Sequence, residues 1–593
     1  MSASASDSRD LFSIGAARRE IRVPVRGVTM LGWGDNEHVA RGAATPLYAR
    51  AIAISAPNGK RVVMLCLETG FVTEVLRAEI RKRTGLAREE LILSATHTHS
   101  APGGFAADVL YALSVGGFIP TVAEAYVAAG VEAVRAALEG LAPGRIRFAA
   151  GTFSDESPVA FNRSLRAWRR NPEAKEWPRK VGAFDTDLAV DREMTLLRFE
   201  DAAGRPIAAW NWFPVHATSM HRDHYLVHSD NKGLAAVATE EAIAREIGGE
   251  NQDFVAVFAQ GAAGDVSPNF RRHVGIREMR GAFRDDERSC RYNAEIQSRK
   301  ALEIFAAAAR APALEAKLDA VLEYHDFSGI EVDPRFVGGR KELRTGPAEV
   351  GLPQLYGTAE GRGAPLPMIR AIAIVVWACR IYNAIVDRLG GRATRWPWTD
   401  DPVQGRKLNV VGAGVREIFE TGRITRLVFP GAIHPVIGAL KKWAKNPALR
   451  ERPFTPQVLP VQLVRLGHLA IAGVPAEFTT VAGMRLRKML EAELRATGTE
   501  RVVIQGYANG FSSYVTTPEE YVAQKYEGGC TLFGRWTLPA YLTVFHQMLE
   551  RFLAGKPATK LAAPEPSPEF WRAITSEMVV ERGESVEPSQ KRA

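Results

Sequence analysis

Residues 254–269, FVAVFAQGAAGDVSPN, join an apolar run to a loop of small residues. The run over 254–260 has the length and composition of a strand that is buried on both faces. A helical pattern precedes it over 232–248, and another follows it over 293–311. Strands and helices interleave in the same way along most of the chain. We therefore predict an α/β (mixed α+β) fold, built as one large domain of layered mixed β-sheets flanked by helices.

The alternation continues in both directions from this stretch. Toward the N-terminus, the turn Pro57-Asn58-Gly59 separates two apolar runs and predicts a hairpin. Toward the C-terminus, Gly467 predicts the turn of a strand pair. Strands are also predicted over 90–99 and 207–217, and helices over 72–85, 123–141, 482–498 and 537–555.

The composition is that of a globular protein. The chain has 593 residues, 46% hydrophobic and 24% charged, which excludes wholesale disorder. Its cysteines form no CxxC pair and indicate neither a disulfide framework nor a zinc knuckle. The first residues lack the basic and apolar segments of a secretory signal. The longest uncharged apolar run, 371–379, is shorter than the about 20 residues that span a bilayer. We predict a cytoplasmic protein.

The two ends of the chain differ in composition from the rest. Residues 1–10 are polar and are predicted to be disordered. Residues 557–593 are rich in Pro, Glu and Ser and are predicted to form a flexible tail. The catalytic domain is therefore predicted to cover residues 11–556.

Basic charge is concentrated in residues 366–452. This window contains 15 Lys or Arg and 6 Asp or Glu, an excess as large as the formal net charge of +9 of the whole chain. It also contains the most apolar helical stretches, MIRAIAIVVWACRIYNAIV and AIHPVIGALKKWAKN. This pattern suits peripheral contact with an anionic membrane. A core-packed helix pair with a solvated basic rim would explain it equally. We expect no nucleic-acid partner, because RNP, zinc-finger and basic-zipper patterns are absent from the sequence.

Polar residues at the ends of predicted strands are the first candidates for chemistry. His97 and His99 would share one face of a strand, where two imidazoles can ligate one metal or divide between metal and substrate. His216 ends another apolar strand. Ser267 lies in the glycine-rich loop, where its hydroxyl could act as a nucleophile beside free backbone N–H groups. Core packing of the histidines and an ordinary turn around Ser267 are the structural alternatives.

Further candidates are weaker when taken alone. Glu477 follows an apolar strand just before a helix and could be a metal ligand or a charge at a helix start. Tyr514 and Tyr526 could ligate a metal or hydrogen-bond an oxyanion, although most tyrosines serve packing. A loop with metal-like spacing contains His221, His224 and His228.

Taken together, these segments resemble the neutral (non-lysosomal) ceramidase family. The similarity is collinear from about Ile14 to about Leu553 and includes ILSATHTHSAPGG, FNRS, NWFPVHATSM, FVAVFAQGAAGDVSPN, LAIAGVPAEFTT and YVTTPEEYVAQKYEG. The resemblance implies a hydrolase acting on linear amide C–N bonds, which cleaves ceramide to sphingosine and a fatty acid. It also implies a zinc ion (Zn2+) at the base of a pocket, with a serine on the glycine-rich loop.

Matched position by position, the resemblance assigns roles to nine residues. It implies Ser267 as the nucleophile and His99 as a contact to substrate oxygen. The implied zinc ligands are His97, His216, Glu477 and Tyr514, and the other implied active-site residues are Arg163, Asp265 and Tyr526. Whether Ser267 or a zinc-bound hydroxide attacks the amide stays open.

The sequence also departs from the family. The family's C-terminal immunoglobulin-like domain is expected to be absent, and residues 360–456 align poorly. The divergent region leaves the substrate open. The first interpretation is a ceramidase. The second is a zinc amidase or esterase for another N-acyl or acyl lipid, and the third is a non-catalytic lipid-binding protein. The oligomeric state is also left open.

Overall fold

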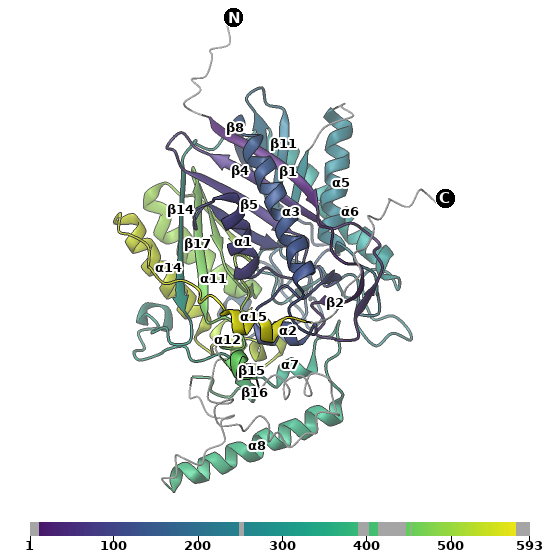
Figure 1. Cartoon of the computed structure of the whole chain (residues 1–593), viewed down its shortest axis with the longest axis vertical. Helices are drawn as coiled ribbons and strands as arrows, with labels where there is room; N and C mark the ends of the chain where they lie inside the picture. Colours follow the sequence, from purple (N-terminus) through teal and green to yellow (C-terminus); the bar gives the residue numbers. More distant parts are fainter. Residues whose placement is uncertain (1–10, 248–253, 390–402, 413–445, 451, 577–593) are drawn as a thin grey trace, which may run out of the picture.

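Two β-sheets that pack face to face form the centre of the protein. The computed structural model describes residues 11–247, 254–389, 403–412, 446–450 and 452–576 (Figure 1). The larger sheet has the strand order β12-β11-β10-β8-β1-β4-β5-β6, and the smaller has β14-β17-β18-β20. Their strands are β1 (Phe12–Glu20), β4 (Tyr48–Ser55), β5 (Arg61–Leu67), β6 (Leu91–Ala95), β8 (Ala142–Thr152), β10 (Glu193–Asp201), β11 (Pro206–Trp212), β12 (Val255–Ala259), β14 (Leu318–Asp326), β17 (Val458–Leu466), β18 (Leu469–Gly473) and β20 (Arg501–Gln505).

Both sheets are mixed, as the sequence predicted. The pairs β5–β6, β11–β12 and β18–β20 are parallel, and the remaining neighbours are antiparallel. The predicted hairpin is β4–β5, and the predicted strand pair at Gly467 is β17–β18.

Side chains of β4 show how the layers form. Ala49, Ala51 and Ala53 point into a core shared with the helices, whereas Ile52 and Ile54 point into a core shared with the second sheet. Successive strand residues face opposite sides of a sheet, so one strand serves both layers. The small alanines let a helix pack closely, and the isoleucines fill the space between the sheets.

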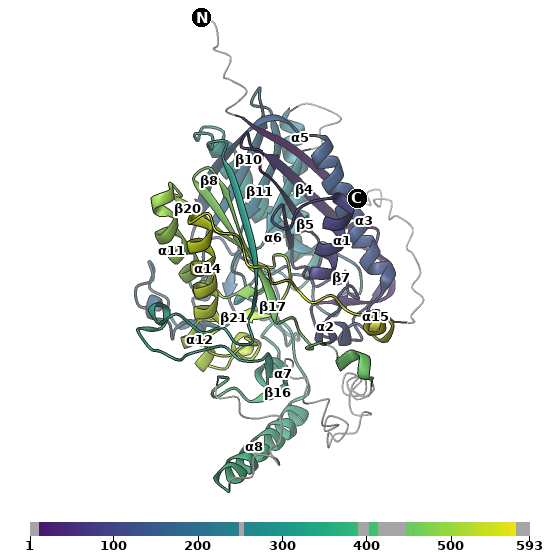
Figure 2. The same ribbon diagram turned by 60° about the vertical axis from the view of Figure 1, so that its left-hand side comes forward.

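Helices cover the outer face of each sheet. The helices α1 (Glu74–Thr84), α3 (Pro120–Glu139), α5 (Asp230–Ile247) and α6 (Asp286–Ala308) pack on the larger sheet. The helices α11 (Thr480–Leu494) and α14 (Thr537–Leu553) pack on the smaller one, as Figure 2 shows. The result is a four-layer arrangement of helices, sheet, sheet and helices, which confirms the predicted fold class.

Short strands and further helices complete the fold. The short strands are β2 (Arg26–Leu31), β3 (Val39–Arg41), β7 (Ala101–Pro102), β9 (Phe161–Asn162), β13 (Val266–Ser267), β15 (Glu349–Gly351), β16 (Asn409–Gly412), β19 (Glu477–Phe478) and β21 (Tyr514–Val515). The other helices include α2 (Val109–Leu113), α4 (Leu165–Trp168), α7 (Pro353–Tyr356), α8 (Leu366–Arg388), α12 (Pro518–Val522), α13 (Tyr526–Gly529) and α15 (Pro568–Ile574).

Residues 557–593, predicted to form a flexible tail, include the short helix α15. The helix α15 begins after Ser567, whose side chain caps it by accepting from the N–H of Phe570. Phe570 and Ile574 are fully buried in the core of the smaller sheet. The composition, which is rich in Pro, Glu and Ser, gave no indication that these two apolar residues are buried. Residues 577–593 lie outside the described part of the chain, as do residues 1–10.

The first apolar stretch of the basic window forms α8, at the lower end of the molecule in Figures 1 and 2. Its residues Leu366–Val386 have a mean hydropathy of 1.7 and are long and apolar enough to cross a membrane. Arg370 and Arg380 bound the uncharged run 371–379, so this run is shorter than the apolar helix that contains it. The second stretch, AIHPVIGALKKWAKN, lies almost entirely outside the described residues.

Candidate active site

The candidate residues meet where strands of both sheets end. His97 follows β6, His216 follows β11 and Ser267 follows β12, all from the larger sheet. Glu477 and Tyr514 follow β18 and β20 of the smaller sheet. Each of these strands has a parallel neighbour, and loops at the carboxyl ends of parallel strands gather at one edge. The topology therefore brings together residues that lie far apart in the sequence.

Two short pairings fix these loops to one another. Thr98 and Ala217 form a parallel bridge that joins the first two histidine loops. Glu477 pairs directly with Tyr514 where β19 runs beside β21. Gly264 lies against β19, and a Cβ atom there would be 2.7 Å from the carbonyl oxygen of Glu477. Only glycine allows the serine loop to approach the strand of Glu477 so closely.

The two histidines of the THTH motif contact each other, but not through strand alternation. The strand β6 ends at Ala95, and His97 has a left-handed backbone with φ of 70°. Its N–H donates to Thr69 O at 2.9 Å, and the N–H of His99 donates to Ala217 O at 3.3 Å. The predicted geometry of a shared strand face is wrong. The Nε2 atoms nevertheless lie 3.1 Å apart, because each turn of the loop is fixed by its own backbone bond.

The imidazoles are oriented as metal ligands usually are. His97 Nδ1 bonds to Gly70 O, and His216 Nδ1 bonds to Val266 O at 2.8 Å. A carbonyl oxygen only accepts, so each Nδ1 donates its N–H and each Nε2 faces the carboxylate, the orientation in which a neutral imidazole offers its lone pair to a metal. These two Nε2 atoms lie 3.5 and 3.1 Å from Glu477 Oε2. Two imidazole nitrogens and a carboxylate thus converge on one point.

The same residues fit a metal by a second criterion. Ligand atoms of His97, His99 and His216 lie within 4.8 Å of one another, and all three residues are buried. His216 Nε2 and His99 Nδ1 make no hydrogen bond with any residue that the structure describes. Buried polar atoms normally have partners, so these nitrogens are available to a metal or a ligand. Burial lowers the pKa of both histidines, which keeps them neutral.

Glycine also makes room for His99. A Cβ atom on Gly32, whose φ is 123°, would lie 2.4 Å from His99 Cγ. The next residue, Trp33, meets the same imidazole edge to face with ring centroids 5.0 Å apart. The Gly32-Trp33 pair therefore shapes one wall of the histidine cluster.

Arg163 is the centre of a buried ionic network. Its Nη1 donates to Glu360 at 2.7 Å and its Nε to Glu527 at 3.0 Å. Its Nη2 donates to Gly264 O at 2.8 Å and to the Tyr514 hydroxyl at 3.0 Å. The planar guanidinium can serve four acceptors at once, which lysine cannot. Arg163 thus ties the serine loop to the predicted tyrosine ligand.

Ser267 is bonded to a carboxylate that the sequence analysis missed. The Ser267 hydroxyl donates to Glu360 Oε2 at 2.5 Å and accepts from the N–H of Asn269 at 2.9 Å. Glu360 also accepts from Thr218 and Asn269. Burial alone would raise the pKa of Glu360, but the charge of Arg163 and these bonds lower it to about 2. The carboxylate is therefore ionised in the resting protein and accepts each of these hydrogen bonds.

The carboxylate of Asp265 bonds to residues other than Ser267. Its carboxylate accepts from the N–H and hydroxyl of Thr480, each at 2.8 Å, and from Asn162 at 2.7 Å. Burial raises the pKa of Asp265 to about 6, although these donors oppose the rise. Asp265 thus anchors the start of α11 and positions the serine loop.

Two tyrosines line the other side of Arg163. Tyr526 stands edge-on to Tyr514 with ring centroids 5.5 Å apart, and its own centroid is 5.7 Å from the guanidinium carbon. Tyr507, which the sequence analysis did not single out, donates to Glu477 Oε2 at 3.1 Å. No local signal marks Tyr507, because its role depends on the turn after β20.

The second histidine group has separate partners. His221 contacts Asp286 at 3.2 Å and stacks on Trp33, while His228 lies 3.1 Å from Glu287. Within the described ranges, the grouping of possible metal ligands is confined to His97, His99 and His216. The interpretation of residues 221–228 as a loop therefore accounts for these histidines.

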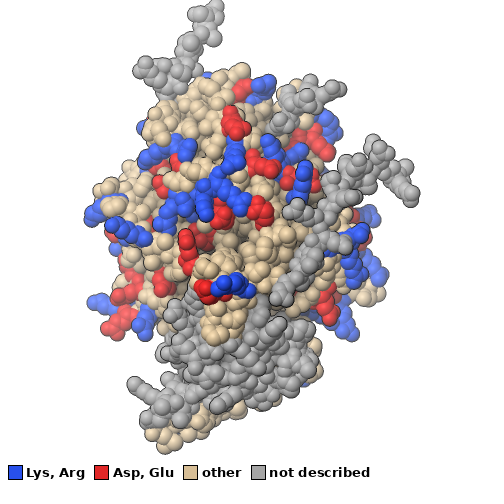
Figure 3. All heavy atoms as spheres, in the orientation of Figure 1, with Lys and Arg blue, Asp and Glu red and all other residues tan. Residues whose placement is uncertain are grey.

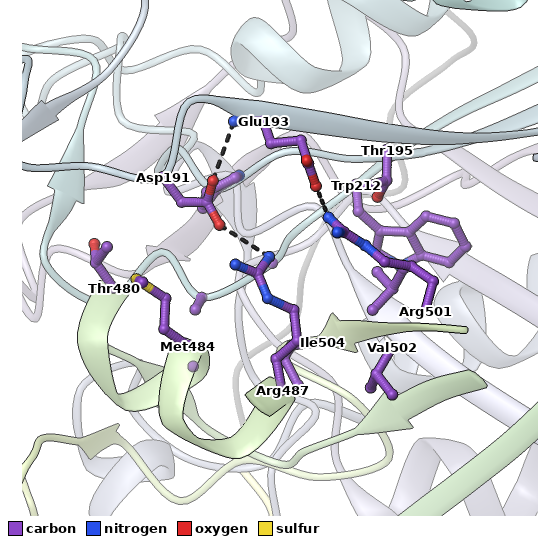
Figure 4. A pocket seen from close by; sticks show the side chains of 15 residues that line it. Asp191, Glu193, Thr195, Trp212, Thr480, Met484, Arg487, Arg501, Val502 and Ile504 are labelled. Atoms are coloured by element: carbon purple, nitrogen blue, oxygen red, sulfur yellow. Dashed lines mark hydrogen bonds and ion pairs between the residues drawn. The ribbon is translucent and has the colours of Figure 1, made fainter. Parts of the chain in front are cut away.

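A small cavity lies behind the serine loop. Figure 4 shows Arg487 paired with Asp191, and Arg501 paired with Glu193. The cavity has a volume of about 50 Å³ and is also lined by Thr480, the residue that Asp265 holds. Such a volume suits a few water molecules and excludes an acyl chain.

The fold and the site define an enzyme of mixed α/β architecture, with a buried histidine group beside a serine. The sequence profile of the neutral/alkaline non-lysosomal ceramidases (N-terminal part) matches residues 12–370 and 444–543. The chain belongs to this family of hydrolases. The predicted resemblance is therefore confirmed, and residues 371–443 lie outside the match.

Individual relatives agree with this assignment. The neutral ceramidase of Pseudomonas aeruginosa is 34% identical over 92% of this chain and 73% of its own length. The neutral ceramidase of Mycobacterium tuberculosis is 29% identical over 94% of this chain and 80% of its own. A solved structure described as a ceramidase complexed with C2 has a TM-score of 0.75, with 31% identity over 94% of this chain and 78% of the other.

Proposed function

We propose that this protein hydrolyses the N-acyl amide bond of ceramide, releasing sphingosine and a fatty acid, at a zinc site held by His97, His216, Glu477 and Tyr514. Family membership and the printed names of the relatives support ceramide as the substrate. The convergence of two Nε2 atoms on Glu477 Oε2 supports the metal and is the observation that carries the proposal. His and carboxylate ligands suit zinc.

When bound, zinc would supply a Lewis acid that polarises the amide carbonyl oxygen. The protein's own residues then have separable tasks. Ser267 Oγ forms a bond to the amide carbon while its proton moves toward Glu360 Oε2, the acceptor it already contacts. The C–N bond breaks as the amine nitrogen takes up this proton from Glu360 Oε2. Water next cleaves the acyl-serine ester, which gives the fatty acid and restores the hydroxyl.

Other residues position these groups. Arg163 keeps Glu360 ionised and holds the Tyr514 hydroxyl toward the site. His99 lies against His97 and Tyr526 against Tyr514, where they could contact the amide oxygen. Asp265 keeps the serine loop against α11. Ser267, Glu360 and the histidines are buried, which strengthens the electrostatic interactions among them.

The test is one measurement on purified protein. We expect wild type to carry about one zinc per chain, as a four-residue ligand set would. It should cleave a fluorescent short-chain ceramide, and removal and return of zinc should abolish and restore cleavage. His97→Ala should lose the zinc, whereas His468→Ala, at the turn between β17 and β18, should keep it. Full metal-free activity would contradict the zinc site. Bound zinc without ceramide cleavage would point to another acyl substrate.

The pH dependence follows from the buried histidines. Burial lowers the pKa of His99 and His216 below the ordinary value of 6.5, so both are neutral at pH 7 and become charged only in acid. Protonation would remove the lone pair that a metal needs. We therefore expect activity and zinc content to be retained at neutral and alkaline pH and to fall together as the solution is acidified. An acidic optimum with zinc fully bound would contradict this ligand set.

A further inference from the structure

The helix α8 has one face that the domain covers. Ile369, Ile372 and Val376 recur at helical spacing and pack against Leu352, which precedes α7. Partly buried Leu408 and Val410 add to this small cluster. The contact fixes the orientation of the helix against the domain. It also means that only part of the helix surface remains for another partner.

The opposite face of α8 is apolar and exposed. Ile374, Trp377, Ile381 and Ile385 have exposed fractions of 66%, 61%, 41% and 51%. Their spacing of three and four residues places them on one side of the helix. Tyr382 lies beside them and is 43% exposed. Exposed aliphatic and aromatic residues gathered in this way mark an interaction surface.

Charge identifies the partner that suits this face. The described helix has arginines at positions 370, 380 and 388, and its first acidic residue is Asp387 near the end. Arg370 and Arg388 are exposed. The window over 366–452 carries the whole net positive charge of the chain. Elsewhere on the face in Figure 3, basic and acidic side chains are interspersed, while the described atoms at the lower end are mostly tan.

We propose that α8 is a membrane-interface helix that docks the protein on an anionic lipid surface. Its exposed apolar face would enter the boundary between headgroups and acyl chains, with Trp377 and Tyr382 at the headgroup level. Exposed Arg370 and Arg388 would meet lipid phosphates. The helix lies in the interface and does not span it, because Ile369, Ile372 and Val376 remain packed on the domain.

The biological role of this docking surface rests on the proposed function. Ceramide is a membrane lipid, so an enzyme that cleaves it must reach it in a bilayer. Glu360, the acceptor for Ser267, lies six positions before the start of α8. An extended chain covers at most about 3.6 Å per residue, so six residues bridge no more than about 22 Å. The lipid-facing helix is thus tethered close to the reacting serine.

A vesicle-binding assay, which does not depend on catalysis, tests the proposal. Full-length protein would be sedimented with phosphatidylcholine vesicles that contain or lack phosphatidylserine. We expect binding to be stronger with phosphatidylserine and to weaken as salt is added. The double variant Trp377→Glu/Ile381→Glu should bind at least about tenfold more weakly, because it places charges among acyl chains. Arg370→Glu/Arg388→Glu should lose the preference for phosphatidylserine.

A matched control uses other exposed apolar residues. Phe184 and Val274 are 91% and 93% exposed and lie outside α8. The variant Phe184→Glu/Val274→Glu should bind vesicles like wild type. All variants should unfold at the wild-type temperature and cleave dispersed short-chain ceramide at the wild-type rate, which separates a binding defect from misfolding.

Several outcomes would overturn the docking surface. Equal vesicle binding by the α8 and control variants would remove the role of this face. Resistance of the bound protein to alkaline carbonate extraction would indicate a spanning helix. A wild-type dimer that the α8 variant converts to monomer would assign the face to a second copy. Vesicle binding without ceramide cleavage would leave the docking surface standing and reject the proposed substrate, whereas cleavage without binding would do the reverse.

Discussion

Glu360→Gln is expected to lower kcat by about 10²- to 10⁴-fold, the range for loss of a positioned proton acceptor. The substitution keeps the size of the side chain but removes the negative charge that accepts the Ser267 proton. Ser267→Ala should lower kcat at least as much. Both variants should keep zinc, because the metal-facing nitrogens of His97 and His216 are oriented by backbone carbonyls. Steady-state kinetics with short-chain ceramide and a zinc assay on the same samples provide the measurement.

A double variant decides whether Glu360 acts through Ser267. If the two residues form one unit, Ser267→Ala/Glu360→Gln should be no slower than Ser267→Ala alone. Glu323→Gln is the control, since Glu323 is buried and contacts Arg551 and His325 and not the residues of the site. A Glu360→Gln enzyme with wild-type kcat and a raised KM would show that the carboxylate only shapes the pocket. Undiminished activity of Ser267→Ala would favour direct attack by water.

Arg163→Met is expected to destabilise the protein by about 3–5 kcal/mol, the usual cost of removing one partner from a buried ion pair. Both carboxylates that Arg163 binds, Glu360 and Glu527, are nearly inaccessible, at 3% and 2% exposure. Neither would have another cation within the network to replace the guanidinium. The melting temperature of the variant should fall clearly below that of wild type, and activity should fall with it because Glu360 loses its orientation.

A surface pair provides the control for this effect. Arg179 contacts Asp155 at 2.7 Å, but both side chains are substantially exposed. Arg179→Met should change stability by no more than about 1 kcal/mol. Arg163→Lys should recover only part of the loss, because an ammonium group cannot serve two carboxylates and a carbonyl in one plane. An unchanged melting temperature for Arg163→Met would mean that Glu360 and Glu527 are solvated or protonated in the folded protein.

Much of the fold could be predicted because its strands are apolar and its helices are long. The hairpin β4–β5, the buried strand β12 and the helix α3 all stand where periodicity placed them. The tail was harder, since α15 has seven residues and only two of them, Phe570 and Ile574, reach the core. Composition averages over such short segments. The left-handed turn at His97 was also hidden, because no residue type in THTHS requires it.

Residues of the site could be predicted where they belong to a recognisable sequence motif. His97, His216, Ser267, Glu477 and Tyr514 belong to collinear family motifs, and the structure brings their segments together. Glu360 carries no such signal, because it is a single acid in a loop. Its partner Ser267 is 93 residues away, so only the tertiary structure reveals the contact. Asp265 shows the opposite case, because it belongs to a strong motif but has a structural role.

The ionic network around Arg163 also bears on how the chain completes its folding. Arg163 contacts groups that lie 197, 351 and 364 positions further along the chain, at Glu360, Tyr514 and Glu527. Closing such long loops costs entropy before the contacts can repay it, so these contacts form late. During synthesis, Arg163 leaves the ribosome hundreds of residues before its last partner. Hydrolytic activity therefore reports that nearly the whole chain has reached its native arrangement.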